Sequence, residues 1–135
     1  GIFVEVEIDR WLEKLYLPRN PMIQMLLNLI KNSVESIDEC KREGATIEGK
    51  ITVSVTKVEE WIELRVEDDG MGIDPEWAPS IFKFGQSSKR RGTGFGLHSA
   101  ANFITGVGGS IEVESAGHHQ GAVMIVQLPI EMAEH

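Results

Sequence analysis

Amide and carboxyl side chains recur at helical spacing in one apolar stretch of the chain. Asn28 and Asn32 are four residues apart and Glu35 follows three residues later, so all three would project from one face of a helix. A single asparagine in such a place is usually satisfied by neighbouring backbone groups. Two asparagines in register favour a role in ligand binding. A carboxamide oxygen is a hard metal ligand that suits Mg²⁺ bound together with phosphate groups.

The second group is a carboxylate followed by two glycines, in the stretch VEDDGMGI at residues 66–73. Asp68 follows an alternating strand pattern, and Gly70 and Gly72 would let a ligand approach the backbone. An Asx turn that leaves a strand explains the same residues without a ligand. The functional alternative is that the carboxylate accepts a hydrogen bond from an exocyclic amine, which would let it recognise adenine by its amino group.

Glycines form the third group, in GTGFGLH at residues 92–98. Gly92, Gly94 and Gly96 precede a predicted helix, so backbone N–H groups and the helix N-terminus can face an anion. Their spacing fits neither the dinucleotide nor the P-loop fingerprint, and a mobile loop that closes on a helix is the alternative. The joint occurrence of the three groups in this order favours a nucleotide site.

Alternating and helical patterns predict the elements that hold these groups in place. The 135 residues, of which 41% are hydrophobic, suffice for one ordinary core and not for two, so we expect one domain over residues 1–135. Alternation predicts strands near residues 2–8, 51–55, 62–66, 111–113 and 123–128, the second and third as a hairpin. Helical spacing predicts helices at residues 21–40 and 96–105, and a short helix after Asp9. Residues 74–91 would form a long connection, which is usually functional or mobile.

Charge and composition exclude several classes of protein. The formal net charge of −8 argues against a nucleic-acid surface, because such binding depends on clustered lysine and arginine, and only Lys89, Arg90 and Arg91 form a basic cluster. No apolar run approaches the roughly 20 residues that cross a bilayer, and no signal-peptide pattern is present. Cys40, the single cysteine, is expected to be a small half-buried residue, which suits a reducing cytoplasm. Trp61 is expected to pack in the core or against the long connection.

Four stretches, in this order and spacing, resemble the sequence boxes of the ATP-binding domain of sensor histidine kinases, within the superfamily shared with gyrase, MutL and the large heat-shock chaperones. NLIKNSVESI at residues 28–37 resembles the asparagine box, and DDGMGI at 68–73 the first glycine box. IFKFGQSSK at 81–89 resembles the phenylalanine box, and GTGFGLH at 92–98 the second glycine box. GGSIEVES and GAVMIVQLP resemble the closing hairpin, so the resemblance extends over residues 18–130.

The resemblance implies a two-layer α/β sandwich, the Bergerat fold, with a mixed sheet of about five strands covered on one face by about three helices. It also implies binding of ATP with Mg²⁺. Asn32 would be the Mg²⁺ ligand, Asp68 the adenine anchor, and residues 74–91 a flexible lid with Lys89 as a charge partner at its end. The residues implied to contact the nucleotide are Asn28, Asn32, Asp68, Gly70, Gly72, Ile73, Phe82, Lys89, Gly92, Thr93, Gly94, Phe95, Gly96 and Leu97.

Two positions refine the activity that the resemblance implies. Asn28 lies where ATPases of the superfamily place a water-activating glutamate, and an amide cannot act as a general base. Phosphoryl transfer to a partner is therefore implied over fast hydrolysis. Ala122 lies where kinases of this family often have a threonine near the adenine, so one hydroxyl contact would be missing.

The sequence around each histidine indicates whether this chain contains the phosphoryl acceptor. None of His98, His118, His119 and His135 is followed by the acidic residue and N-P step of the family's acceptor histidine, so the acceptor is not expected in this chain. The resemblance implies transfer to a histidine on a separate helical domain of the same protein, a downstream response regulator, and a homodimeric full-length protein. We expect a cytoplasmic domain, whether or not the parent protein is anchored in a membrane. A serine kinase of the same fold and a non-catalytic nucleotide-sensing module are the alternatives.

Overall fold

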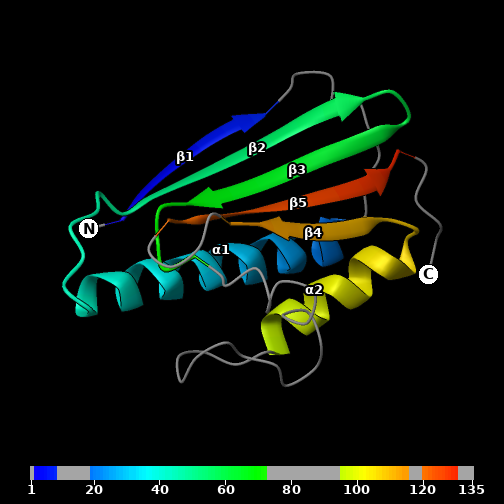
Figure 1. Cartoon of the computed structure of the whole chain (residues 1–135). Helices are drawn as coiled ribbons and strands as arrows, with labels where there is room; N and C mark the ends of the chain where they lie inside the picture. The colour runs from blue at the N-terminus through cyan, green and yellow to red at the C-terminus, as the bar shows by residue number, and fades with distance from the viewer. Residues whose placement is uncertain (1, 9–18, 73–94, 116–119, 131–135) are drawn as a thin grey trace.

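The computed structural model describes residues 2–8, 19–72, 95–115 and 120–130 (Figure 1). Within them, the predicted elements occur with the predicted types and in the predicted order. They are β1 (Phe3–Ile8), α1 (Arg19–Arg42), β2 (Lys50–Val58), β3 (Trp61–Asp68), α2 (Phe95–Gly106), β4 (Ser110–Glu114) and β5 (Ala122–Pro129). The short helix predicted after Asp9 and the connection over residues 74–91 lie outside the described residues.

The strands form one five-stranded sheet in the order β1-β2-β3-β5-β4. β1 runs parallel to β2, whereas the other three pairs are antiparallel, so the sheet is mixed as predicted and β2 and β3 form the predicted hairpin. Both described helices lie on the same face of the sheet (Figure 1). The two-layer α/β sandwich is thereby confirmed, with two described helices where about three were expected.

The core lies between the two helices and the inner face of the sheet. Strand β3 shows how the sequence creates this face, because buried Ile62, Leu64 and Val66 alternate with residues that point to the other side. The helices contribute the apolar residues of their inner sides. Further buried side chains of this core are Met25, Leu29, Ile37, Ile51, Val53, Ala100, Ile104, Met124, Val126 and Leu128.

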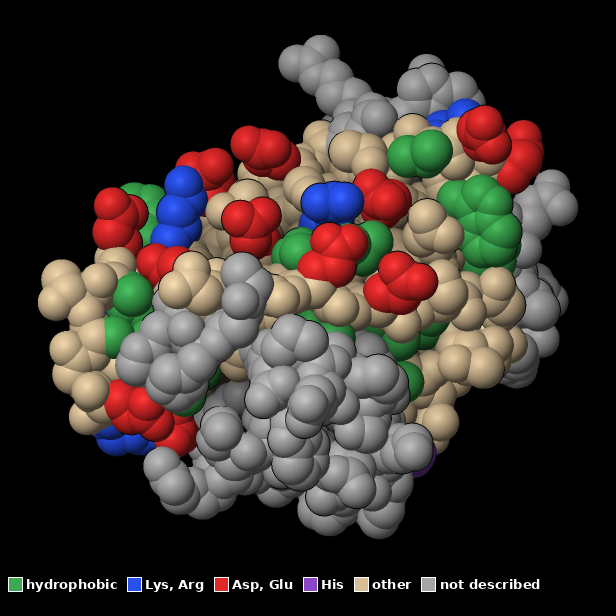
Figure 2. All heavy atoms as spheres, in the orientation of Figure 1, with side chains coloured by type: hydrophobic (Ala, Val, Ile, Leu, Met, Phe, Trp, Pro, Cys, Tyr) green, Lys and Arg blue, Asp and Glu red, His purple; other side chains and the backbone are tan. Residues whose placement is uncertain are grey.

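The charged residues on the outer face of the sheet are mostly acidic. Glu63, Arg65 and Glu67 of β3 belong to this face, and Arg65 Nε lies 3.4 Å from Glu63 Oε2. Figure 2 shows acidic side chains spread over one side of the molecule, with the basic side chains of the described residues lying singly among them. Such a surface would repel a polyanion. Among the described residues, neither helix combines the length and apolar character that a membrane span requires.

Of the two places predicted for Trp61, the core is wrong, and packing against residues 74–91 lies outside the described residues. Trp61 is 38% exposed, because the register that buries Ile62 turns the preceding residue to the outer face. There Trp61 lies opposite Val58 on β2 and Pro129 on β5. The apolar residues of β1 are also exposed, because this strand is at the edge of the sheet, away from the helices (Figure 1).

Candidate nucleotide site

Asp68 ends β3 with a carboxylate that is held by hydrogen bonds from two parts of the chain. The Ser33 hydroxyl of α1 donates to Oδ2 over 3.0 Å, and the Gly70 N–H donates to Oδ1 over 2.9 Å. The residue is only 8% exposed, and a carboxylate is stable at such a place only when hydrogen bonds compensate for lost hydration. The Gly70 bond is the Asx turn that the sequence allowed. The Ser33 bond was not predicted, and it joins the strand end to the long helix α1.

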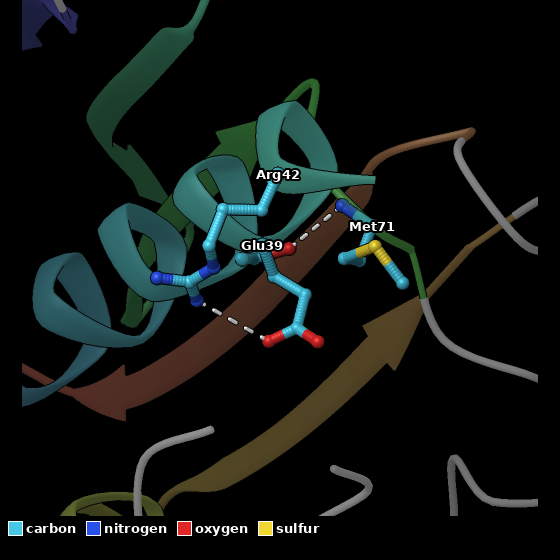
Figure 3. Close-up of polar contacts among 4 residues, drawn as sticks. Glu39, Arg42 and Met71 are labelled. Carbon is cyan, nitrogen blue, oxygen red and sulfur yellow. Dashed lines mark hydrogen bonds and ion pairs between the residues drawn. The ribbon is translucent and has the colours of Figure 1, made fainter. Parts of the chain in front are cut away.

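The loop that follows Asp68 lies directly on α1. The Met71 N–H donates to the Ser36 hydroxyl over 2.9 Å, and Figure 3 shows Met71 beside the turn of α1 that carries Glu39 and Arg42. A Cβ on Gly70 would lie 2.5 Å from Ser36 Oγ and 2.9 Å from the backbone nitrogen of Ile37. The missing side chain of Gly70 therefore makes room for the helix, whereas the sequence suggested room for a ligand.

We expect that Gly70→Ala destabilises the domain by about 1–3 kcal/mol, because a Cβ would push the loop and α1 apart. Urea unfolding measures this change in the free energy of unfolding. Gly106→Ala is the control, since a Cβ on this last residue of α2 meets nothing within 4 Å. Equal stability of the Gly70 variant and the wild type would show that the loop does not rest on the helix as described.

Asp69 fastens the same loop to β2. Its Oδ1 accepts the Lys50 N–H over 2.8 Å and its Oδ2 accepts the Gly49 N–H over 3.1 Å. The loop is thus held on one side by serines of α1 and on the other by the start of β2. This double attachment fixes the backbone around Asp68.

A cavity of about 430 Å³ opens at the ends of β3, β4 and β5, within the size range of small-molecule sites. The register of β3 and β5 places Ala122 opposite Asp68 on its wall. Gly121 permits this close pairing, because it has a φ of 74° and a Cβ there would lie 2.3 Å from the Asp68 carbonyl oxygen. The cavity is lined by Glu67, Asp68, Glu114, Ser115, Gln120, Gly121, Ala122 and Val123. Glu67, Val123 and Glu114 line it from the outer face of the sheet, whereas the Asp68 side chain turns to α1 on the inner face.

Asn28 and Asn32 are half-buried on α1, one turn apart. Gln24 Nε2 donates to Asn28 Oδ1 over 3.3 Å, whereas no hydrogen bond to another described residue holds the Asn32 carboxamide. Ser33, the next residue, bonds to Asp68, so α1 brings the asparagine box and the first glycine box together. No cluster of three or more His, Cys, Asp or Glu side chains among the described residues could hold a metal. A metal here would rely on the Asn32 oxygen, water and ligand oxygens, which is a donor set that suits Mg²⁺.

The remaining predicted site residues are only partly described. Gly72 has a φ of 75°, which favours glycine. Helix α2 begins at Phe95 and includes Gly96 and Leu97, so the second glycine box leads into a helix as predicted, and this helix packs against α1. Residues that lie outside the described part of the chain are Ile73, Phe82, Lys89, Gly92, Thr93 and Gly94.

Cys40 and His98 have structural roles in the described part of the chain. Cys40 is fully buried, more than predicted, and the pKa of its thiol is raised by burial and by the carboxylates of Glu43, Asp69 and Asp68. It therefore remains a neutral packing group at neutral pH. His98 is half-buried on α2, with Nε2 at 3.1 Å from Asn102 Nδ2.

The sequence did not identify Ser33, Ser36 and Asp69 as parts of this site. The available signal was two serines three residues apart within the apolar side of a helix, where their hydroxyls need partners.

Two curated relatives of the chain are named as kinases. The chain matches the family model described as histidine kinase-, DNA gyrase B-, and HSP90-like ATPase over residues 18–132. Sporulation kinase D of Bacillus subtilis (strain 168) is 32% identical over 136 residues, which cover 94% of this chain and 24% of the relative. The sensory histidine kinase/phosphatase NtrB of Rhizobium meliloti (strain 1021) is 31% identical over 137 residues, which cover 95% of this chain and 35% of the relative. The chain thus spans between a quarter and about a third of these relatives.

Solved structures share the fold. The mycobacterial sensor histidine kinase MprB superposes with a TM-score of 0.77 at 22% identity, over 95% of this chain and 81% of that one. The catalytic domain of histidine kinase ThkA superposes with a TM-score of 0.72 at 27% identity, over 95% of this chain and 78% of that one. Since the family model covers most of the chain and the fold agrees, the chain belongs to the family of histidine kinase-, DNA gyrase B- and HSP90-like ATPases.

Proposed function

We propose that this chain is the ATP-binding catalytic domain of a sensor histidine kinase, which transfers the γ-phosphoryl group of ATP to a histidine on a separate domain. The observation that carries the proposal is the buried Asp68 carboxylate, joined through Ser33 to the helix that holds Asn32. The names of the curated relatives support it. The fold also agrees with that of a solved full-length ShkA in complex with AMPPNP, at a TM-score of 0.75 and 21% identity.

Asp68 would recognise the adenine base. An ionised carboxylate only accepts hydrogen bonds, so it pairs with the amino group of adenine and is repelled by the carbonyl oxygen that guanine has at the same position. Ala122 lies directly opposite Asp68 and shares its face of the sheet, so it offers an apolar surface beside the carboxylate against which a base could lie.

Asn32 would hold Mg²⁺ at the phosphate end of the nucleotide. Its half-buried carboxamide, without a partner among the described residues, fits a hard cation that keeps most of its ligands from water and phosphate. When bound, Mg²⁺ would neutralise part of the phosphate charge. Asn28, one turn earlier, offers no carboxylate to activate water, so this chain would hydrolyse ATP slowly and present it to an acceptor.

The acceptor would be a helical domain of the same protein, with a response regulator receiving the phosphoryl group afterwards. The relatives are three to four times longer than the matched region, which leaves room for such a domain in their chains. A homodimer of the full-length protein would bring each catalytic domain near an acceptor histidine. Transfer within this assembly would depend on placement of the γ-phosphoryl group, because Asn28 supplies no base.

We expect Asn32→Ala to abolish most of the Mg²⁺ dependence of ATP binding. Calorimetric titration with ATP, in Mg²⁺ and in excess chelator, gives the affinity under both conditions. Asn20→Ala removes an exposed amide from the first turn of the same helix and should leave the dependence unchanged. Equal affinity of the wild type under both conditions would contradict the metal assignment.

A further inference from the structure

We propose that Ser33 is a positioning residue that orients the Asp68 carboxylate for the amino group of adenine. The inference rests on the proposed function, in which Asp68 reads the base. Ser33 is 1% exposed on α1, and its hydroxyl donates to Asp68 Oδ2 over 3.0 Å. The two residues are 35 positions apart in the sequence, so this bond is made by the fold and not by a local turn.

A carboxylate that reads a base needs a fixed plane as well as a fixed position. The terminal torsion of an aspartate is broad, so the Asx bond from Gly70 to Oδ1 alone would leave the carboxylate free to rotate about that contact. The Ser33 bond reaches the other oxygen from a different element. Two donors on two oxygens define the plane, and they do not exhaust the roughly four acceptor sites of a carboxylate.

Two described residues near Asp68 differ from Ser33 in what they can do. Ala122, opposite Asp68 on β5, has no hydrogen-bonding side chain. Ser36 is one helical turn from Ser33, but its hydroxyl accepts the backbone N–H of Met71 and so holds the loop instead of the carboxylate. The two serines thus divide two tasks: Ser36 fixes where the loop lies, and Ser33 fixes how the carboxylate faces.

The position of Ser33 also sets the spacing within the site. It follows Asn32 directly on α1, so the group that would hold Mg²⁺ and the group that orients Asp68 move together with one helix. Any shift of α1 would therefore change the base end and the phosphate end of the site at once.

The test compares ATP with purine riboside triphosphate, which has the same ring system without the amino group. Calorimetry should show that wild type prefers ATP. Ser33→Ala should weaken ATP about 5- to 10-fold and leave the analogue nearly unchanged, because only the amino group depends on the carboxylate plane. Ser33→Thr keeps the hydroxyl and should restore most of the preference. Ser36→Ala should alter both nucleotides alike and keep the preference for ATP.

Each possible result either supports or contradicts the positioning role of Ser33. A Ser33→Ala protein with the wild-type preference, or one that loses both nucleotides equally, would overturn the positioning role while leaving Asp68 as the reader of the base. A wild type that binds both nucleotides equally would overturn the assignment of Asp68 itself, and this inference with it. Thermal unfolding of each variant confirms that the protein is folded. If Ser33→Ala does not fold, Ser33→Cys, with a much weaker donor of similar size, should lose the ATP preference in the same way.

Discussion

Replacing Asp68 by alanine is expected to weaken ATP binding about 10- to 150-fold, which corresponds to about 1.5–3 kcal/mol, the usual range for a hydrogen bond to a charged group. The loss has two causes. The amino group of adenine loses its acceptor, and the Ser33 hydroxyl and Gly70 N–H lose theirs as well. The preference for ATP over GTP should fall with the affinity, because guanine never gained from the carboxylate.

Asp68→Asn is a sharper test of the same assignment. The amide has nearly the same shape, but its NH₂ group would turn to the Ser33 hydroxyl, which can accept from it, and only one oxygen would remain to accept from the Gly70 N–H and from adenine. We therefore expect this substitution to weaken ATP nearly as much as alanine does. Asp38→Ala removes an exposed carboxylate from α1 and controls for the change in net charge. Calorimetry with ATP and GTP measures the affinity for ATP and the preference for ATP over GTP. A wild type that binds the two nucleotides equally would show that Asp68 does not read the amino group.

The elements were predictable where the apolar pattern is long and regular. Helical spacing predicted residues 21–40, and α1 covers Arg19–Arg42. Alternation predicted the hairpin of β2 and β3 and placed Asp68 at a strand end, where the structure has it. Local periodicity suffices for such elements because a single buried face determines it.

The polar contacts within the site were not predictable in the same way. Ser33 and Asp68 meet only because the sheet and the helix pack face to face, and no local pattern records a contact over 35 positions. Gly70 shows the same limit, since the sequence indicates that space is needed but not that α1 fills it. The core position predicted for Trp61 was wrong for a related reason, because the strand register turns this residue to the outer face.

This chain alone is expected neither to label itself nor to hydrolyse ATP quickly, and it should phosphorylate a separately supplied helical acceptor domain from its parent protein. The first expectation follows from the histidines, none of which has an acceptor context, and from the contacts of His98 with Asn102 on α2. It follows also from Asn28, whose amide accepts a hydrogen bond from Gln24 and cannot activate water. The second follows from a site that binds ATP without a base and therefore leaves the γ-phosphoryl group to an external nucleophile.

Incubation with γ-labelled ATP, first alone and then with the acceptor domain, separates these cases. Label on the acceptor that is lost in acid and kept in base would identify phosphohistidine, whereas acid-stable label would point to a serine kinase of the same fold. Asp68→Ala should reduce transfer at limiting ATP and should recover at saturating ATP, because Asp68 acts on binding and not on the phosphoryl group. Rapid phosphate release in the absence of an acceptor would contradict the kinase assignment in favour of an ATPase, and binding of ATP without transfer to any acceptor would favour a nucleotide-sensing module.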